Sequence, residues 1–386
     1  QGDFSDNCSF GNAGMITPSH FVPLASPGVV AQGIRWMFKS SSPFFIRPRL
    51  DVDLLHWLWR FYRSCNRRQA EAAMPVLLDF NLLGKKGYRD FQEETGLDFK
   101  LEERGILMLY QSPKTEREEV ETVEIANKLG IEAQLLNARQ VQEMEPELAV
   151  KCLGGVFFPG DAHLHPVILM QHLKAHLTKQ GVHFHPKKAV DGFVMNGKKV
   201  TAITCGSEHF PADQFLLTAG SRTAILLKKA GIRLLLQDGK GYSYMLKNPA
   251  RRPRNASILL EARVAVTPMG DDLRFGGTLE LSGHDDHINQ NRFRGILEAI
   301  PKYYPGVDIE MPSPQAIWHG YRPCSPDGLP YIGRLNKLEN VVVATGHAMM
   351  GLSLAPATGL MVRDLVTETP EVNFAFHRFF NPNRFG

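Results

Sequence analysis

The sequence predicts an α/β fold with two domains, and three observations support this prediction. The chain has 386 residues, more than one hydrophobic core usually serves. From residue 154 onward, short apolar runs alternate with segments of helical length, the order typical of α/β proteins. Two apolar runs, ending at 218–220 and 344–346, pass through a small residue and a glycine toward a helix. We therefore expect a strand-and-helix domain and a second domain with paired strands around 258–281.

Composition and charge exclude several classes of protein. Apolar residues make up 43% of the chain and charged residues 22%, which excludes a disordered or coiled-coil protein. The net charge of +4 is spread without a basic stripe, so we expect no nucleic-acid partner. Five scattered cysteines favour a reducing, cytoplasmic location over a disulfide framework. No apolar run approaches the length of a membrane span, and we expect no signal peptide.

The first part of the chain is expected to be mainly helical. Apolar and aromatic residues recur at helical intervals over 51–66, after an N-cap-like aspartate, and give this helix an unusually aromatic face. A second helix over 74–95 is expected to break near Gly84-Lys85-Lys86-Gly87. A strand at 105–110 and a Glu-rich helix at 113–129 follow.

The remainder is expected to alternate strands and helices. Strands are expected at 155–158, 182–185, 189–195, 199–205, 214–220, two pieces of 258–281, and 340–346. Helices are expected at 166–180, 221–230, 285–300 and 352–367. The Asn196-Gly197 pair predicts a hairpin between its two flanking strands, because Asn-Gly is the strongest short hairpin signal.

The two strand–glycine–helix corners suit an anionic or electron-rich ligand. At Thr218-Ala219-Gly220 and Ala344-Thr345-Gly346 the backbone N–H groups can approach a ligand closely. The N-terminus of the following helix adds roughly half a positive charge. Any parallel α/β protein carries small residues at strand ends, so each corner alone is equally compatible with a purely structural role.

A longer pattern near the C-terminal end is more specific. Residues 319–334 contain Gly-Tyr-Arg-Pro and Ser-Pro-Asp-Gly-Leu-Pro-Tyr-Ile-Gly, and 346–359 read Gly-His-Ala-Met-Met-Gly-Leu-Ser-Leu-Ala-Pro-Ala-Thr-Gly. Three further segments agree with it: 9–16, 215–221, and the helix 51–66 with its Phe45-Ile46-Arg47-Pro48 lead-in. Together they resemble the FAD-dependent amine and D-amino-acid oxidoreductase superfamily over most of the chain. The bacterial D-amino-acid dehydrogenase branch is the nearest in pattern.

The resemblance implies a discontinuous Rossmann-like FAD-binding domain and a substrate domain with a mixed or antiparallel sheet. The FAD-binding domain is expected to comprise 1–45, 150–235 and 315–386, and the substrate domain 46–149 and 236–314. Members of the superfamily begin with a strand and a Gly-x-Gly-x-x-Gly turn, and neither is present here. Because Gln1-Gly2-Asp3 resembles the residues that follow this region, we expect about thirty residues of the pattern to be missing.

The resemblance also assigns roles to individual residues. Arg322 corresponds to the arginine that holds the substrate carboxylate through a two-point ion pair, although an arginine that bridges domains is the structural alternative. His347, Tyr242 and Tyr244 are further candidates for the substrate pocket, or else packed core residues. The expected cofactor contacts are Ser9, Asn12, Ala13, Gly14, Met15, Val190, Thr218, Ala219, Gly220, Gly346, Met349, Met350, Gly351, Leu352 and Ser353.

No metal site is expected. The pairs His163/His165, His172/His176 and His183/His185 lack third and fourth ligands at a suitable spacing.

The implied activity is FAD-dependent oxidative deamination of D-amino acids. Arg322 would hold the carboxylate while hydride passes from Cα to the flavin, and the imino acid would hydrolyse to a 2-oxo acid and ammonia. One alternative is a glycine, sarcosine or hydroxyproline-type oxidase that uses oxygen. Another is a shortened, inactive or partner-dependent subunit that binds no FAD.

The electron acceptor is expected to be quinone or another acceptor. The aromatic helix lies among several arginines within 47–68 and could rest on the inner face of the cytoplasmic membrane through residues 51–68. A buried helix with arginines at the domain rim is equally compatible with the pattern.

Overall fold

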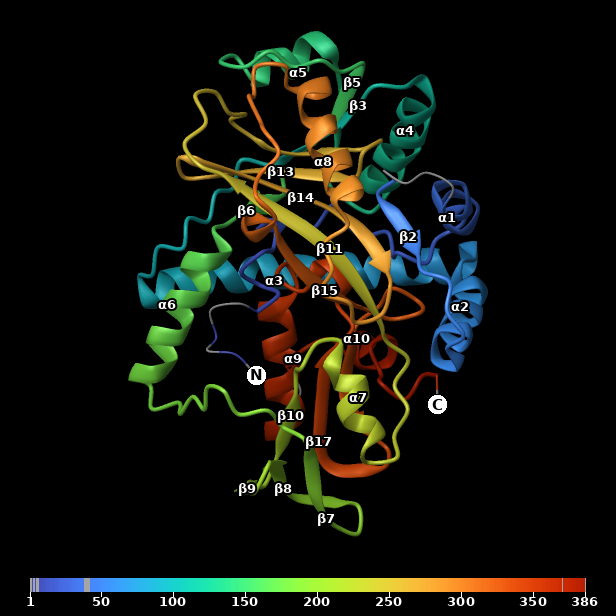
Figure 1. The fold of residues 1–386 in the computed structure, drawn as a ribbon, viewed down its shortest axis with the longest axis vertical. Helices are drawn as coiled ribbons and strands as arrows, with labels where there is room; N and C mark the ends of the chain where they lie inside the picture. Colours follow the sequence, from blue (N-terminus) through green and yellow to red (C-terminus); the bar gives the residue numbers. More distant parts are fainter. Residues whose placement is uncertain (1, 3, 5–6, 38–41, 370, 386) are drawn as a thin grey trace.

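A nine-stranded mixed sheet forms the upper half of the molecule (Figure 1). The computed structural model describes residues 2, 4, 7–37, 42–369 and 371–385. The strand order is β15-β11-β14-β13-β12-β3-β5-β4, and β2 pairs with β14. The strands are β2 (Phe44–Ile46), β3 (Ile106–Tyr110), β4 (Gln134–Asn137), β5 (Gly154–Phe158), β11 (Gln237–Leu246), β12 (Ala256–Leu259), β13 (Val264–Met269), β14 (Asp272–Leu281) and β15 (Trp318–Cys324).

The lower half contains a three-stranded sheet and a separate hairpin sheet (Figure 1). In the first sheet, β17 (Leu338–Thr345) lies between β10 (Phe215–Leu217), which is parallel to it, and β16 (Tyr331–Leu335), which is antiparallel. The second comprises β7 (Gly192–Asn196), β8 (Lys199–Cys205) and β9 (Glu208–Pro211), and it confirms the hairpin expected at Asn196-Gly197. A short pair, β1 (Met15–Ile16) with β6 (Ala162–His163), completes the strands.

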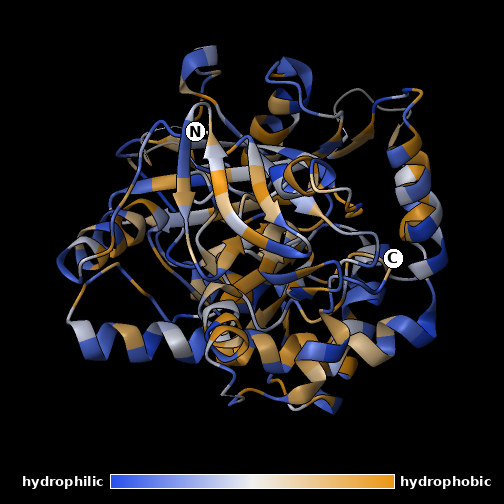
Figure 2. Ribbon diagram, turned by 90° about the horizontal axis from the view of Figure 1, so that it is seen from below, coloured by the Kyte–Doolittle hydropathy of each residue, from blue (hydrophilic) through white to orange (hydrophobic). Residues whose placement is uncertain are grey.

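Helices pack against the nine-stranded sheet and against the three-stranded sheet that contains β17. They are α1 (Val29–Met37), α2 (Val52–Ser64), α3 (Arg67–Thr95), α4 (Pro113–Lys128), α5 (Ala138–Met144), α6 (Pro166–Lys179), α7 (Arg222–Lys228), α8 (Gln290–Tyr303), α9 (Ala355–Thr367) and α10 (Phe374–Phe379). Helix α8 packs Phe293 and Ile296 onto one face of the large sheet, in one core with Phe275. Figure 2 shows that the long helices alternate hydrophobic and hydrophilic residues, as amphipathic surface helices do.

The aromatic helix predicted over 51–66 is confirmed as α2. Asp51 caps it by accepting hydrogen bonds from the backbone of Asp53 and Leu54. On its inner side Trp57 donates from Nε1 to the carbonyl oxygen of Cys324 at 2.9 Å. Its other aromatic residues are not all buried, since Trp59 is 50% exposed.

The break predicted in the second helix is wrong, because α3 runs without interruption from Arg67 to Thr95. Its two glycines permit close packing instead. A Cβ on Gly84 would lie 2.4 Å from the carbonyl oxygen of Ser353, and a Cβ on Gly87 would lie 2.5 Å from Pro356 Cβ. The tertiary contact therefore outweighs the low helix propensity of glycine.

Two other predicted elements also differ. Residues 182–185 form no strand, because they link α6 to β7 over the surface and Val182 is 43% exposed. The helix predicted from 285 begins only at Gln290, where the Asn289 side chain accepts from the backbone N–H of Arg292. An N-cap of this kind fixes the helix start.

The sheet pairing also bears on the domain boundaries. The ranges expected for the cofactor domain include 154–158 and 318–324, yet β5 and β15 pair within the nine-stranded sheet. The division of the chain into two domains remains a prediction.

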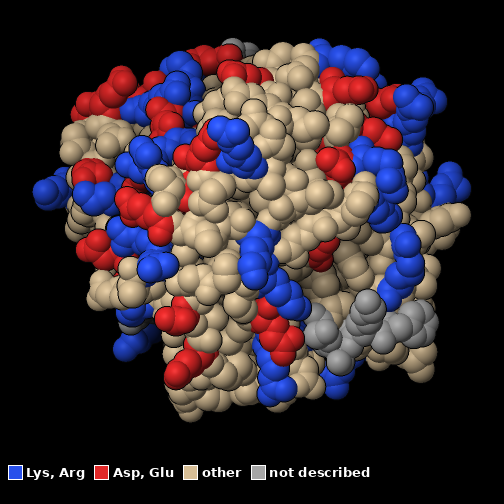
Figure 3. Space-filling view, turned by 90° about the horizontal axis from the view of Figure 1, so that it is seen from above, with Lys and Arg blue, Asp and Glu red and all other residues tan. Residues whose placement is uncertain are grey.

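The described residues include no helix whose length and hydropathy would allow it to cross a bilayer. On the upper face of the molecule, lysines and arginines are interspersed with acidic residues (Figure 3).

Candidate functional site

The two predicted strand–glycine–helix corners lie next to each other. β10 and β17 are parallel neighbours, with Leu217 paired to Val343, so both chains leave the sheet at the same edge. Thr345 Oγ1 donates to the carbonyl oxygen of Gly220 at 2.8 Å and ties the corners together. We call residues 218–220 and 346–352 the strand-end edge. The carboxyl ends of parallel strands are where α/β proteins bind ligands.

A cavity of about 2010 Å³ extends from this edge to the large sheet. It brings together most of the residues predicted for the site. Those that line it are Ser9, Asn12, Ala13, Met15, Thr218, Ala219, Gly220, Tyr242, Arg322, His347, Met349, Met350, Gly351 and Leu352.

Five predicted site residues do not line the cavity. Gly346 and Gly14 both have positive φ, and a Cβ on Gly14 would lie 2.2 Å from the carbonyl oxygen of Leu164. Tyr244 packs with Phe293, and Val190 is 38% exposed on the surface.

Ser353 is the fifth, and it is buried behind the strand-end edge. Its hydroxyl accepts from the backbone N–H of Thr17 at 3.0 Å and donates to Asn81 Oδ1 at 2.8 Å. The Ser353 hydroxyl therefore holds the loop of the strand-end edge on the side that faces away from the cavity.

Arg322 is a partly buried cation at the cavity wall. Its Nη1 donates to the carbonyl oxygen of Thr278 at 2.6 Å, and desolvation lowers its pKa. Among the described residues it makes no ion pair, and the nearby thiols of Cys8 and Cys324 supply no countercharge because burial raises the pKa of each. Burying a guanidinium without a carboxylate is costly, so this position favours an anionic ligand.

Gly241 provides the space for this guanidinium. A Cβ on Gly241 would lie 2.1 Å from Arg322 Nη1. Gly241 belongs to β11, which pairs with β15 on one side and β14 on the other. The sequence does not indicate this role, because nothing local to Gly241 points to residue 322.

Thr278 is a functional candidate that the sequence did not indicate. Between paired positions, two steps along β11 (Tyr242 to Lys240) match three along β14 (Gly277 to Glu280), so β14 bulges here. Thr278 has a φ of 65°, and its hydroxyl is buried with no hydrogen-bond partner among the described residues. It also lines the cavity. A β-branched residue in this strained conformation, with an unsatisfied hydroxyl beside a ligand space, indicates a functional position.

We call Gly241, Thr278 and Arg322 the three-strand wall, because each comes from a different strand of the large sheet.

Arg274 and Trp318, also not predicted, fix the loop that carries Asn12. Buried Arg274 donates to the carbonyl oxygens of Phe10 at 2.8 Å and Asn12 at 2.6 Å, and burial lowers its pKa to about 10. The Trp318 ring lies where a Cβ on Gly11 would stand, only 2.1 Å from Trp318 Cδ2. The loop is thus held against the large sheet.

Tyr242 and His347, the two predicted pocket residues with titratable rings that line the cavity, already make contacts within the protein. The Tyr242 hydroxyl accepts from the backbone N–H of Asn289 at 3.0 Å, and burial raises its pKa. His347 Nε2 lies 3.0 Å from Thr358 Oγ1, and burial lowers its pKa to about 4. At neutral pH the His347 imidazole is therefore uncharged, and it adds no fixed cation to the strand-end edge.

Titratable groups also line the cavity. Burial raises the pKa of Glu119 to about 7, against the lowering effect of nearby Arg263. Burial and the charge of Arg263 lower the pKa of His20 to about 4. Met108 and Ile258 add an apolar floor to the lining.

The described residues contain no group of three or more His, Cys, Asp or Glu side chains placed to hold a metal ion.

Comparisons with known proteins identify the family of this chain. A family profile described as "FAD dependent oxidoreductase" matches residues 1–365. The chain is 28% identical over 376 residues to a D-amino acid dehydrogenase of Granulibacter bethesdensis, covering 95% of this chain and 88% of that protein. It is 30% identical over 378 residues to a D-amino acid dehydrogenase of Xanthobacter autotrophicus, again covering 95% and 88%.

Among solved structures, glycine oxidase from Geobacillus kaustophilus has a similar fold. The TM-score is 0.75 at 21% identity, and the match covers 98% of this chain and 89% of that one. A family match over nearly the whole chain, together with this shared fold, shows that the protein belongs to the FAD-dependent oxidoreductase family.

Proposed function

We propose that the protein catalyses the FAD-dependent oxidative deamination of D-amino acids. The relatives named D-amino acid dehydrogenase at 28–30% identity support this substrate class. The single observation that carries the proposal is Arg322, a partly buried guanidinium without a carboxylate partner among the described residues, which faces a large cavity bounded by the strand-end edge.

The cavity lining fits a flat, elongated cofactor such as FAD. Small residues bring the backbone to its surface on two sides, with Ala219 and Gly220 at the strand-end edge and Ala13 on the opposite loop. A planar ring needs such backbone contact because side chains would hold it away. Residues 218–220 would hold the phosphate region, and Asn12, Ala13, Met15 and 349–352 the ring.

On the substrate side, Arg322 would bind the carboxylate. With Nη1 donating to Thr278, its remaining N–H groups are available for a two-point ion pair. The unpartnered Thr278 hydroxyl would donate to the same carboxylate or accept from the amine. The apolar floor at Met108 and Ile258 would contact the side chain.

The reaction then requires orientation more than acid–base chemistry. When bound, FAD would accept the Cα hydrogen with its electron pair as a hydride equivalent, and the neutral amine would become an iminium group that loses a proton to give the imine. The imino acid adds water and releases ammonia and a 2-oxo acid. The three-strand wall fixes Cα by holding the carboxylate, and the uncharged His347 leaves the backbone dipoles of the strand-end edge to set the local potential.

We further propose that electrons leave to a quinone or a similar acceptor at a membrane surface contacted by α2. The outward residues Leu55, Trp59 and Tyr62 are 57%, 50% and 66% exposed. Aromatic and aliphatic side chains beside arginines suit the interface of a bilayer.

The deciding experiment is anaerobic reduction of the FAD-loaded protein by a panel of D- and L-amino acids. Loss of flavin absorbance near ~450 nm with D-amino acids alone would support the proposal. No bleaching by any member of the panel would refute the proposal. Bleaching by L-amino acids alone would show that the substrates are L- and not D-amino acids.

A second measurement separates the dehydrogenase from an oxidase. Aerobic turnover that produces hydrogen peroxide in step with substrate loss would identify a glycine oxidase-type enzyme. Turnover that requires an added quinone or dye would identify a dehydrogenase.

A further inference from the structure

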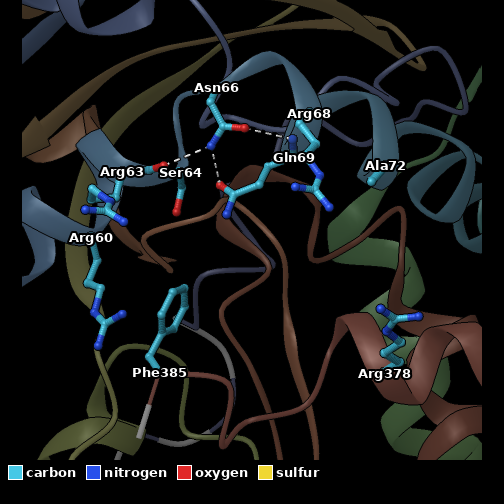
Figure 4. Close-up of a pocket in the computed structure, with 9 residues that line it drawn as sticks. All are labelled: Arg60, Arg63, Ser64, Asn66, Arg68, Gln69, Ala72, Arg378 and Phe385. Carbon is cyan, nitrogen blue, oxygen red and sulfur yellow. Dashed lines mark hydrogen bonds between the residues drawn. The ribbon is translucent and has the colours of Figure 1, made fainter.

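A second cavity lies outside the flavin region, where α2, α3 and α10 meet the C-terminal segment (Figure 4). Its volume is about 610 Å³. Arg60 and Arg63 come from α2, Arg68 from the first turn of α3, and Arg378 from α10. The close-up shows Arg60 and Arg63 on one side and Arg68 and Arg378 on the other (Figure 4). We call this cavity the arginine pocket; its other lining residues are Ser64, Asn66, Gln69, Ala72 and Phe385.

None of the described residues that line the arginine pocket is acidic. None of its four arginines makes an ion pair within the described part of the chain. Arginines nearby behave differently, since Arg67 pairs with Glu71 at 2.7 Å and Arg384 pairs with Asp327 at 2.7 Å. Four cations around one cavity repel each other, and an anion would relieve this repulsion.

The guanidinium groups on α2 are held in place by aromatic rings. Arg60 Cζ lies 5.0 Å from the ring centroid of Trp59 and 5.7 Å from that of Phe385. Arg63 Cζ lies 5.6 Å from the Trp59 ring centroid. A stacked guanidinium keeps most of its in-plane N–H donors available. These contacts therefore orient the side chains and leave most of their hydrogen-bond donors free for a ligand.

Neutral donors and a helix end add to the positive potential. Asn66 caps α3 by accepting from the backbone N–H of Gln69 at 3.0 Å. The pocket therefore borders the N-terminus of a 29-residue helix, where the peptide dipoles leave partial positive charge. The hydroxyl of buried Ser64 also lines the cavity.

We propose that the arginine pocket binds phosphate groups. Planar guanidinium forks match phosphate oxygens in pairs, and arginines on opposite walls can hold a ligand with more than one anionic oxygen cluster. The exposed Leu55, Trp59 and Tyr62 adjoin the rim on α2, which favours the headgroup of an anionic phospholipid over a soluble phosphate. This site is independent of the amino-acid chemistry proposed above.

The test uses the full chain and two phosphate sources. Intrinsic tryptophan fluorescence, to which Trp59 contributes, is titrated with pyrophosphate at constant ionic strength. Sedimentation is measured with vesicles of phosphatidylcholine with and without phosphatidylglycerol. We expect the double variant Arg60→Gln/Arg378→Gln to weaken binding by about ten-fold or more, because each lost charge-assisted hydrogen bond costs more than a neutral one. The matched control is Arg139→Gln/Arg252→Gln, whose guanidiniums pair with Glu143 and Asp271.

Every outcome bears on the proposal. Binding to phosphatidylglycerol vesicles that only the pocket variant loses supports the site and assigns it to lipid. Selective loss of pyrophosphate binding without vesicle binding supports the site and assigns it to a soluble anion. Equal affinity in the pocket and control variants, or no binding of either source by the unmodified chain, overturns it. Neither readout depends on flavin reduction, so failure here leaves the proposed oxidation of D-amino acids standing, although absence of vesicle binding would also count against the membrane contact proposed for α2.

Discussion

The strand-end edge and the three-strand wall face the same cavity but are built in different ways. The edge consists of residues consecutive in the chain, and parallel pairing of β10 with β17 brings its two halves together. The wall takes one residue from each of β11, β14 and β15, so its geometry depends on the register of three strands. A ligand surface made of backbone groups can thus come from short contiguous segments. The position of a side chain such as Arg322 depends instead on strands that are far apart in the sequence.

The largest effect is expected from removing the charge of the wall. Arg322→Gln should lower kcat/KM for D-amino acids by about 10² to 10³, because loss of a buried charge pair costs 2–5 kcal/mol. FAD content should stay near that of the unmodified protein, since the strand-end edge is intact. Steady-state kinetics measures kcat/KM, and the flavin spectrum measures the FAD content. A variant that loses FAD instead would show that the two regions are not separable.

Gly241→Ala tests whether the wall depends on space. The added Cβ would fall 2.1 Å from Arg322 Nη1, so the guanidinium must move. We expect KM to rise by about ten-fold or more, with a smaller change in kcat. Gly160→Ala is the matched control, because nothing lies within 4 Å of a Cβ at that position. Equal kinetics in the two variants would contradict the packing role of Gly241.

Thr278→Val separates stability from binding. Valine keeps the β-branched shape and removes only the unpartnered hydroxyl, so the free energy of unfolding should rise by about 1 kcal/mol. KM should nevertheless increase several-fold, because the substrate loses a hydrogen bond. Urea unfolding and steady-state kinetics provide the two readouts. A destabilised variant with unchanged KM would assign the hydroxyl to the fold alone.

The last prediction concerns stability rather than activity, at Asp161, which binds the cavity-lining residue Ser19. Its carboxylate accepts from the backbone N–H of Ser19 at 3.0 Å, and burial raises its pKa from 3.8 to about 7. The folded state therefore keeps a proton that the unfolded state loses above pH 3.8, so this contribution to stability is full below that pH and declines up to about pH 7.

Asp161→Asn should remove this decline. Relative to the unmodified protein, the variant should gain at least ~1 kcal/mol in the free energy of unfolding between pH 4 and pH 7. Urea unfolding at several pH values measures it. His20 and His347, whose pKa values are lowered to about 4, act in the opposite direction in both proteins and cancel in the difference. A constant difference across this range would contradict the raised pKa.

The same contrast explains what the sequence could predict. Arg322 and the 218–220 corner stand in contiguous motifs, and both line the cavity. Thr278 and Gly241 could not be found, because a bulge and a pairing across strands define them. Val190 followed from the resemblance alone, and it lies on the surface.

Helix boundaries show the same division. Asp51 fixed the start of α2 by a local cap, which a sequence displays directly. The continuity of α3 through Gly84 depends on the carbonyl oxygen of Ser353, far along the chain. Local propensity alone therefore predicted a break that packing prevents.

Helix α3 is uninterrupted and connects two distant sites. Arg68 borders the arginine pocket near one end, and Gly84 packs against the loop that follows the strand-end edge about 24 Å further along the axis. Tyr88 also donates to the carbonyl oxygen of Leu352 at 2.7 Å. Substitutions on α3 outside the cavity can therefore still displace this loop, so the shape of the ligand space depends in part on the stiffness of a distant helix.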